Sequence, residues 1–187
     1  AEALRAIGGD VVLHALDVSA PEDVAAMARA ADEPVDVVVA NAALGARDVG
    51  EFGAVDYARF AHVLAVNVLG AVALAEAFAP HVRRAKGRIA MLSSELGSIA
   101  DSSGGSLAYR TSKSALNMAT TVIAADLARD GVAVAPFHPG WVQTDMGGPR
   151  APTPVADSVR GLRSRIAEMR PTPRPSFLDF AGRRLPW

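Results

Sequence analysis

The sequence predicts an α/β domain with a mostly parallel sheet, and two observations lead to this prediction. Short apolar runs rich in Val, Ile and Leu alternate along the chain with longer stretches of helical periodicity. These runs are nearly continuous, which is typical of strands that helices cover on both faces. With 187 residues, we expect the whole chain, 1–187, to form one domain with a substantial core.

Five strands and four helices are expected in alternation. The expected strands are 10–18, 35–43, 87–94, 132–139 and 176–180. The expected helices are 19–31, 57–84, 107–129 and 155–169. Parallel strands joined by helices of this length place all their carboxyl ends at one edge of the sheet.

Local signals predict how several helices begin and end. Ser19 is the predicted cap of helix 19–31, with Pro21 in its first turn. Helix 57–84 is expected to break or end near Pro80, because proline has no backbone N–H. Helix 107–129 has one apolar face, and Gly131 is expected to stop it in a left-handed conformation.

Composition and charge narrow the function classes. Half of the residues are hydrophobic and 21% are charged, which is typical of a globular domain. The net charge of −1 provides no basic face, so no nucleic-acid partner is expected. The chain has no cysteine and its four histidines are not at ligand spacing, so we predict no metal site.

The longest apolar run, 63–79, includes Asn67 and Glu76. It is at the short limit for a membrane span and polar inside, so we predict a buried helix and no membrane partner. No signal-peptide pattern opens the chain, and the lack of cysteine fits a reducing compartment. A cytoplasmic location is therefore expected.

Tyr109 and Lys113 lie four residues apart at the start of a predicted helix, in a chain with two tyrosines and two lysines. Residues at this spacing share a helix face. A nearby ammonium favours the phenolate and is expected to lower the tyrosine pKa. With a serine hydroxyl to hold the reacting oxygen, such a tyrosine is a general acid for a carbonyl. Taken singly, Tyr109 reads equally as a core residue and Lys113 as a solvated one.

Other polar residues stand at predicted strand ends, where parallel α/β sheets carry their active sites. They are Asp17, Asn41, Ser93, Ser94 and the segment 139–144. Each also has an ordinary explanation as a loop former. Asn67 is polar within an apolar helix, either as a satisfied residue at a kink or as a water-holding link in a proton relay.

These motifs resemble the short-chain dehydrogenase/reductase family, and within it the C-factor and sniffer-type carbonyl reductase branch. The resemblance rests on SSELGSIADSSGGSLAYRTSKSALNM, HPGWVQTDMGG and the ending FLDFAGRRLPW. It implies a catalytic tetrad of Asn67, Ser94, Tyr109 and Lys113, with Ser94 preferred over Ser93 as the second serine of the pair. It further implies a small carbonyl or alcohol substrate and a homodimer formed through helices 57–84 and 107–129.

The resemblance implies NADP or NAD as cofactor, with NADP favoured by the branch. Tyr109 and Lys113 would contact the cofactor as well as the substrate. The other implied contacts are Asp17 and Val18 at the adenine, Asn41 and Ala42 at the ribose, and Pro139, Gly140, Val142 and Thr144 at the nicotinamide.

Two departures from the family stand out. ANAA at 40–43 replaces the family's NNAG, and the family's TGxxxGxG phosphate turn is absent from the sequence. The expected fold is therefore a Rossmann-like doubly wound parallel sheet that lacks its first two strands and the glycine-rich loop, an N-terminally truncated domain. Strand 11–17 would then lie about 14 Å from strand 35–40. We expect it either to shift and pair with 35–40 or to be poorly ordered.

Two functions compete on these residues. The intact tetrad favours a carbonyl reductase. The missing phosphate turn favours an inactive remnant or a signalling or interaction protein. A serine hydrolase is excluded, since no GxSxG elbow is present and His138 lies beside Pro139.

Overall fold

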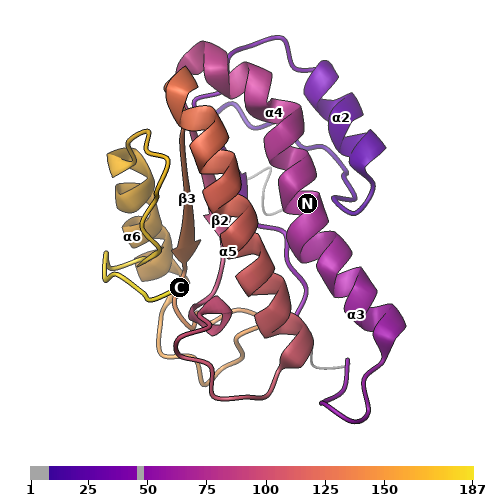
Figure 1. Ribbon diagram of the computed structural model, residues 1–187. Coiled ribbons are helices and arrows are strands. Elements are labelled where there is room, and N and C mark those ends of the chain that lie inside the picture. The colour runs from indigo at the N-terminus through magenta and orange to yellow at the C-terminus, as the bar shows by residue number, and fades with distance from the viewer. Residues whose placement is uncertain (1–8, 46–48) are drawn as a thin grey trace.

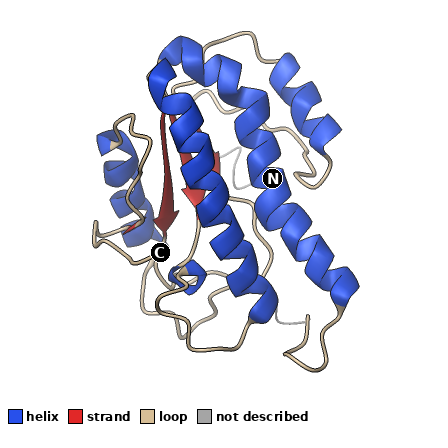
Figure 2. Cartoon of the chain, in the orientation of Figure 1, coloured by secondary structure: helices blue, strands red, loops and turns tan. Residues whose placement is uncertain are grey.

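The computed structural model describes residues 9–45 and 49–187 (Figure 1). Its sheet has the order β1-β2-β3-β4, with every neighbouring pair parallel. The strands are β1 (Val37–Ala40), β2 (Arg88–Leu92), β3 (Ala133–His138) and β4 (Leu178–Asp179). The helices are α2 (Pro21–Arg29), α3 (Tyr57–Leu64), α4 (Ala71–Ala85), α5 (Leu107–Leu127) and α6 (Val155–Glu168). Figure 2 shows helices and strands in the same orientation.

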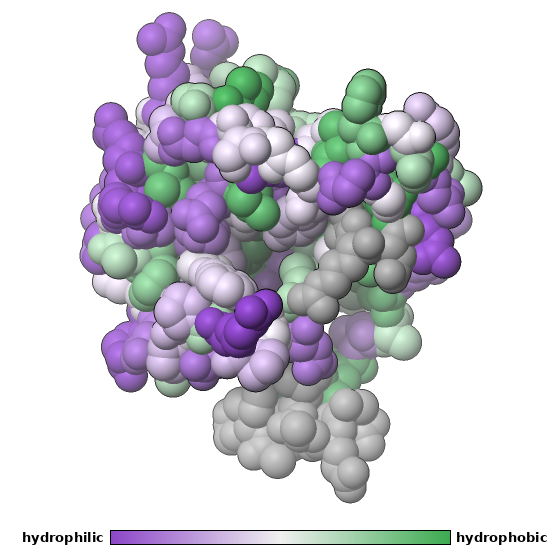
Figure 3. All heavy atoms as spheres, turned by 90° about the horizontal axis from the view of Figure 1, so that it is seen from below, coloured by the Kyte–Doolittle hydropathy of each residue, from purple (hydrophilic) through white to green (hydrophobic). Residues whose placement is uncertain are grey.

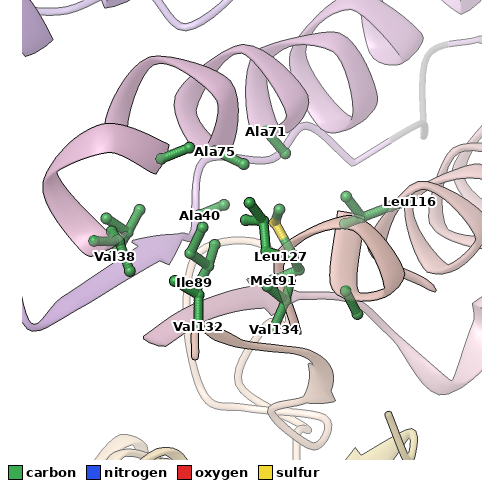
Figure 4. Packing of buried hydrophobic residues seen from close by; sticks show 13 residues of the cluster. Val38, Ala40, Ala71, Ala75, Ile89, Met91, Leu116, Leu127, Val132 and Val134 are labelled. Atoms are coloured by element: carbon green, nitrogen blue, oxygen red, sulfur yellow. The ribbon is translucent and has the colours of Figure 1, made fainter. Parts of the chain in front are cut away.

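Helices cover both faces of the sheet, which confirms the doubly wound α/β prediction. On one face, α4 and α5 pack on alternate strand residues such as Val38, Ile89 and Val134 (Figure 4). On the other face, α6 packs on Ala90 and Phe137. The strands are buried on both faces where helices lie on each side, and this explains their continuous apolar sequences.

All four strands end at the same edge of the sheet. β1 and β2 pair in parallel from Val37↔Arg88, and β2 continues alongside β3 to Leu92↔Phe137. In Figure 1 the strands run downward, so their carboxyl ends lie at the lower side of the molecule. Figure 3 looks onto this side, where hydrophilic residues are interspersed with hydrophobic ones. The start of α5 reaches the same edge.

The predicted strand 10–18 is wrong, because residues 10–16 are assigned to no strand. Of the two outcomes expected for this segment, pairing with 35–40 is wrong, since within the described residues β1 pairs with β2 alone. Val12 is 71% exposed. A strand needs a neighbour to satisfy its backbone, and these residues have none beside them in the described part of the chain.

Ser19 is not the cap of the helix that follows it. The capping position of α2 is Ala20, whose side chain makes no capping hydrogen bond. The Ser19 hydroxyl instead donates to Asp17 Oδ1 at 2.7 Å. Pro21 does occupy the first turn, where a missing backbone N–H removes no intrahelical bond.

The helix that begins at Tyr57 continues through Pro80 to Ala85, so the predicted break at Pro80 is wrong. Pro80 and Glu76 are both exposed, and water can satisfy the Glu76 carbonyl that Pro80 leaves without a donor. The irregularity lies earlier, where residues Ala65–Gly70 form a π-helical segment between α3 and α4. Such segments often mark functional sites.

This 29-residue helical run has the length and mean hydropathy, 1.8, of a membrane span. It nevertheless packs against the sheet through a row of small residues that includes Ala71, Ala75 and Ala79. Small side chains allow the helix to approach the strands closely. These small residues belong to the core on the side of the helix that faces the sheet, and 39% of the membrane-length window is buried.

The carboxyl end of α5 is where the sequence predicts it. Gly131 has φ +79°, the left-handed conformation that ends a helix. β3 begins two residues later.

Candidate active site

Tyr109 and Lys113 lie one turn apart at the start of α5, facing the carboxyl end of β2. Lys113 is 2% exposed, and its Nζ lies 5.6 Å from the centroid of the Tyr109 ring. Nζ donates a hydrogen bond to the carbonyl oxygen of Leu92, the last residue of β2, at 2.9 Å. Lys113 is therefore a buried part of the site, and the alternative of a solvated helix residue is wrong.

Burial lowers the pKa of Lys113 to about 8. The cause is loss of water around the ammonium group, because a charged group is less stable away from water. A pKa of about 8 still leaves the lysine mostly protonated at neutral pH. The site thus contains a poorly hydrated positive charge next to a tyrosine.

The pKa of Tyr109 is raised above its ordinary value, chiefly because the side chain is buried. A hydrogen bond with the Ser94 side chain acts in the opposite direction. The expectation that Lys113 lowers this pKa is wrong for the protein without ligands. Desolvation of the phenolate outweighs the hydrogen bond with Ser94 here.

Ser94, and not its neighbour Ser93, is directed toward Tyr109. The Ser94 hydroxyl accepts a hydrogen bond from the Leu96 backbone N–H at 3.2 Å and caps a short 3₁₀ turn, Glu95–Gly97. The Ser93 hydroxyl donates to Asn117 Oδ1 on α5 at 2.6 Å. Successive residues at a strand end point to opposite sides, which separates the two serines.

Asn67 lies in the π-helical segment and is 1% exposed. Its Oδ1 accepts from the Leu44 backbone N–H at 2.7 Å, and its Nδ2 donates to the Leu44 carbonyl and to the Ser112 hydroxyl, each at 3.0 Å. Ser112 in turn donates to the Tyr109 carbonyl at 2.8 Å. Asn67 therefore ties the loop after β1 to the start of α5, as a satisfied residue at a helix irregularity would.

Comparison with known proteins identifies the fold and its family. The sequence profile described as short chain dehydrogenase matches residues 1–154. The chain belongs to this family. The predicted resemblance is thereby confirmed.

Three similar proteins place the chain near the predicted branch of this short-chain dehydrogenase family. C-signal of Myxococcus xanthus is 42% identical over 156 residues, which cover 82% of this chain and 93% of that protein. The carbonyl reductase Sniffer of D. melanogaster superposes with a TM-score of 0.86 at 29% identity, covering 92% of this chain and 76% of that one. An NADPH-bound carbonyl reductase from chicken fatty liver superposes with a TM-score of 0.83 at 27% identity, covering 92% of this chain and 75% of that one.

The residues of this short-chain dehydrogenase fit one half of a dinucleotide. Asn41 and Ala42 are exposed just beyond β1, and Pro139 and Gly140 are half-buried just beyond β3. Both strands end at the sheet edge where Lys113 lies. An ammonium has three N–H donors, and Leu92 takes one of them, so hydrogen bonding to sugar hydroxyls suits Lys113.

The other predicted cofactor residues make contacts within the chain; Asp17 and Thr144 are exposed, and Val18 and Val142 are half-buried. The Asp17 carboxylate accepts from the backbone N–H and the hydroxyl of Ser19, and these bonds lower its pKa. Val18 packs so closely on Gly70 that a Cβ at Gly70 would lie 2.7 Å from the Val18 carbonyl oxygen. Val142 forms a bridge with Thr153. The Thr144 hydroxyl accepts from the Gly147 N–H at 3.1 Å.

The diphosphate half of a dinucleotide has no matching turn in this sequence. Gly50 and Gly53 follow β1 and have positive φ, but they precede a helix whose first turn is already capped. The cap is the Asp56 carboxylate, which accepts from the Arg59 N–H at 3.0 Å. A negative charge at that helix end repels a phosphate, so α3 does not replace the missing turn.

Sequence reasoning did not select three residues next to Ser94. His138, Glu95 and Arg183 come from β3, the 3₁₀ turn and the C-terminal segment, and their charged or titratable groups face one another. Two sequence features could have pointed to them, because Glu95 directly follows Ser94 and His138 lies at the end of a predicted strand. Their meeting depends on tertiary contacts that one sequence does not display.

Proposed function

We propose that the chain is an NAD(P)-dependent oxidoreductase that reduces a carbonyl group, or oxidises the corresponding alcohol. The observation that supports this most directly is the Tyr109 ring 5.6 Å from Nζ of the buried Lys113, with the Ser94 side chain acting on the Tyr109 hydroxyl. A hydroxyl pair next to a poorly hydrated cation suits protonation of a carbonyl oxygen. The family and its carbonyl reductase members support the same reaction class.

In the proposed reaction, each residue has a separate task. A bound reduced nicotinamide supplies the hydride. The Ser94 hydroxyl holds the carbonyl oxygen of the substrate, and the Tyr109 hydroxyl gives it a proton. The raised pKa of Tyr109 keeps that proton in place at neutral pH, as reduction requires. The Lys113 ammonium then stabilises the phenolate that forms.

The proposed cofactor is NADP or NAD. Lys113 would bind the ribose at the nicotinamide, while Asn41 and Pro139 would line its two sides from the ends of β1 and β3, on either side of β2. The NADPH-bound carbonyl reductase among the structural relatives favours NADP.

The test is turnover of NADPH or NADH with a panel of aldehydes and ketones, followed by loss of reduced-nicotinamide absorbance. Tyr109→Phe is expected to abolish the carbonyl-dependent rate. Tyr57→Phe is the matched control, because Tyr57 is 78% exposed on α3 and is expected to leave the rate unchanged. Equal rates for the two variants contradict the proposal.

A second function, signalling or interaction without catalysis, has its own supporting observation. The relative named C-signal is 42% identical to this chain over 156 residues, which cover 93% of that protein. On this alternative the folded chain binds no nicotinamide cofactor at any accessible concentration. Cofactor binding therefore separates the two functions.

We also propose a homodimer through the helical run 57–84 and helix 107–129. Leu69, Met118 and Val122 are 53–66% exposed on these helices, and burying them in a partner's surface would stabilise an assembly. Sedimentation of Val122→Asp is expected to give monomers where the parent chain gives dimers. Dimers of unchanged stability in this variant place the interface elsewhere.

A further inference from the structure

The turn that follows Ser94 carries a carboxylate directed at the far end of the chain. Glu95 is the first residue of the 3₁₀ turn that Ser94 caps. Its Oε1 lies 3.6 Å from His138 Nε2, and its Oε2 lies 3.9 Å from Arg183 Nη2. One residue next to the serine thus faces both β3 and the C-terminal segment.

Arg183 is held in place by a buried acid. Asp179 is 6% exposed and lies opposite His138 in the register of β3 and β4. Its Oδ1 accepts from the Arg183 backbone N–H at 2.8 Å, and its Oδ2 accepts from Arg183 Nε at 3.0 Å. One of these bonds holds the Arg183 backbone and the other holds Nε of its guanidinium group, which orients the Nη2 that faces Glu95.

His138 adds a nearly buried ring between the two carboxylates. It is 6% exposed, and its Nδ1 has no hydrogen-bond partner in the described part of the chain. Burial is the largest influence on its pKa and lowers it, and Arg183 acts in the same direction, while Glu95 and Asp179 oppose them. The imidazole is therefore neutral at neutral pH, and Arg183 supplies the positive charge that Glu95 faces.

The same C-terminal segment, Phe177–Trp187, holds the serine loop at a second point. The Trp187 carbonyl accepts from the Ala100 N–H at 3.0 Å and from the Ser98 hydroxyl at 3.4 Å. Phe177 is fully buried and its ring contacts that of Trp187. The loop that begins at Ser94 is thus attached to this segment at both Glu95 and Ala100.

We propose that segment Phe177–Trp187 positions Ser94 through the contact of Arg183 with Glu95. Glu95 and Arg183 are positioning residues, because they act on the serine turn and do not touch the reacting atoms. This inference rests on the proposed function at one point, the assignment of Ser94 to the active site. The positioning itself is a property of the chain without ligands, and it is measured there.

The test compares Arg183→Ala and Glu95→Gln with Arg184→Ala in the full chain. Arg184 is the matched control, an adjacent exposed arginine that donates to the Ser176 hydroxyl. The first readout is amide hydrogen exchange of Leu96 and Gly97, which donate to Ser94 Oγ and to the Ser94 carbonyl. Arg183→Ala and Glu95→Gln are expected to raise these exchange rates about two- to fivefold, the range for a partly exposed ion pair. Arg184→Ala is expected to leave them unchanged.

The second readout is the Tyr109 pKa, followed by NMR of chains carrying tyrosine labelled at its ring carbon. If Glu95→Gln weakens the interaction of Ser94 with Tyr109, the Tyr109 pKa rises in this variant, as it is expected to do in Ser94→Ala. Adding Glu95→Gln to Ser94→Ala is expected to move it no further. Unchanged exchange and an unchanged Tyr109 pKa in both variants, or equal effects in Arg184→Ala, overturn the proposal.

Neither readout requires cofactor or turnover, so the two proposals fail separately. If the chain binds no nicotinamide cofactor but the variants show the expected changes in amide exchange, the positioning of Ser94 is supported and the proposed function is contradicted. If Arg183→Ala fails to fold, Glu95→Gln decides alone, because it leaves the bonds between Arg183 and Asp179 intact.

Discussion

Lys113 Nζ lies 5.6 Å from the ring centroid of Tyr109 and donates to the Leu92 carbonyl at 2.9 Å. This arrangement attaches the first turns of α5 to the carboxyl end of β2. It also places a cation over an aromatic face, which stabilises the charge in poorly hydrated surroundings. The spacing of four residues matters because both side chains must reach the same strand end.

The depressed pKa of Lys113 makes stability depend on pH. The lysine titrates near 10.5 when unfolded and near 8 when folded, so the unfolded chain binds more protons between these values. The free energy of unfolding therefore gains a contribution as the pH rises from 8 to 10.5, at most about 3 kcal/mol, and loses it as the pH falls. Lys113→Met is expected to lack this contribution.

The measurement is urea unfolding across this pH range for both chains. Subtracting the variant's curve from that of the parent cancels other titrating groups. Tyr109 is one of them, because its raised pKa lowers the stability as the pH rises through its ordinary value of 10.0, within the same range. A difference between the two curves that stays constant from pH 8 to 10.5 contradicts the account.

Ser94→Ala is expected to raise the pKa of Tyr109 further, because the hydrogen bond that opposes the effect of burial is lost. Ser93→Ala is the matched control. Its hydroxyl bonds Asn117, so we expect a loss of about 1 kcal/mol in stability and no change in the Tyr109 pKa. Alkaline titration followed by NMR measures the Tyr109 pKa in both serine variants, with Tyr57→Phe to assign the two tyrosine signals. A shift in Ser93→Ala would reverse the assignment of the two serines.

Asn67→Ala is expected to destabilise the fold by about 1–3 kcal/mol. It removes three hydrogen bonds and leaves their buried or partly buried partners, on Leu44 and Ser112, unpaired. Asn41→Ala, at an exposed position, is expected to stay within about 0.5 kcal/mol of the parent chain. Thermal and urea unfolding provide the comparison. Similar losses for the two asparagines would mean that the contacts of Asn67 contribute nothing to stability.

Gly97→Ala is expected to displace the serine turn from α5. An added Cβ would lie 2.8 Å from the Lys113 carbonyl carbon and 2.9 Å from its Cβ, closer than packing allows. We expect a loss of about 1–3 kcal/mol and altered amide signals at Lys113. Gly45→Ala is the control, because its added Cβ would meet only the Met146 side chain, at 3.7 Å. Equal stability of the two variants contradicts this packing.

Much of the fold followed from the sequence because its local signals agree with the tertiary structure. The apolar runs at 35–43, 87–94 and 132–139 each contain a parallel strand, and Gly131 ends α5 as expected. The run at 10–18 has the same composition but forms no strand. Composition reports that a segment is apolar, whereas a strand also requires a neighbour to pair with.

The site was predictable where one element carries it and not where several elements meet. The spacing of Tyr109 and Lys113 could be taken from the sequence, because a helix fixes it. The sign of the Tyr109 pKa shift could not, because it depends on how deeply the ring is buried. The π-helical segment at Asn67 and the contact between Glu95 and Arg183 likewise arise only when distant segments pack together.

The most direct test of the central claim is titration of the chain with NADPH and then NADH. Energy transfer from tryptophan reports binding, and Trp141 lies next to Gly140 at the proposed nicotinamide side. We predict saturable binding and a thermal midpoint that rises with cofactor concentration, since a ligand of the folded state stabilises it. A folded chain with no energy transfer and an unchanged midpoint would contradict the assignment as an NAD(P)-dependent oxidoreductase.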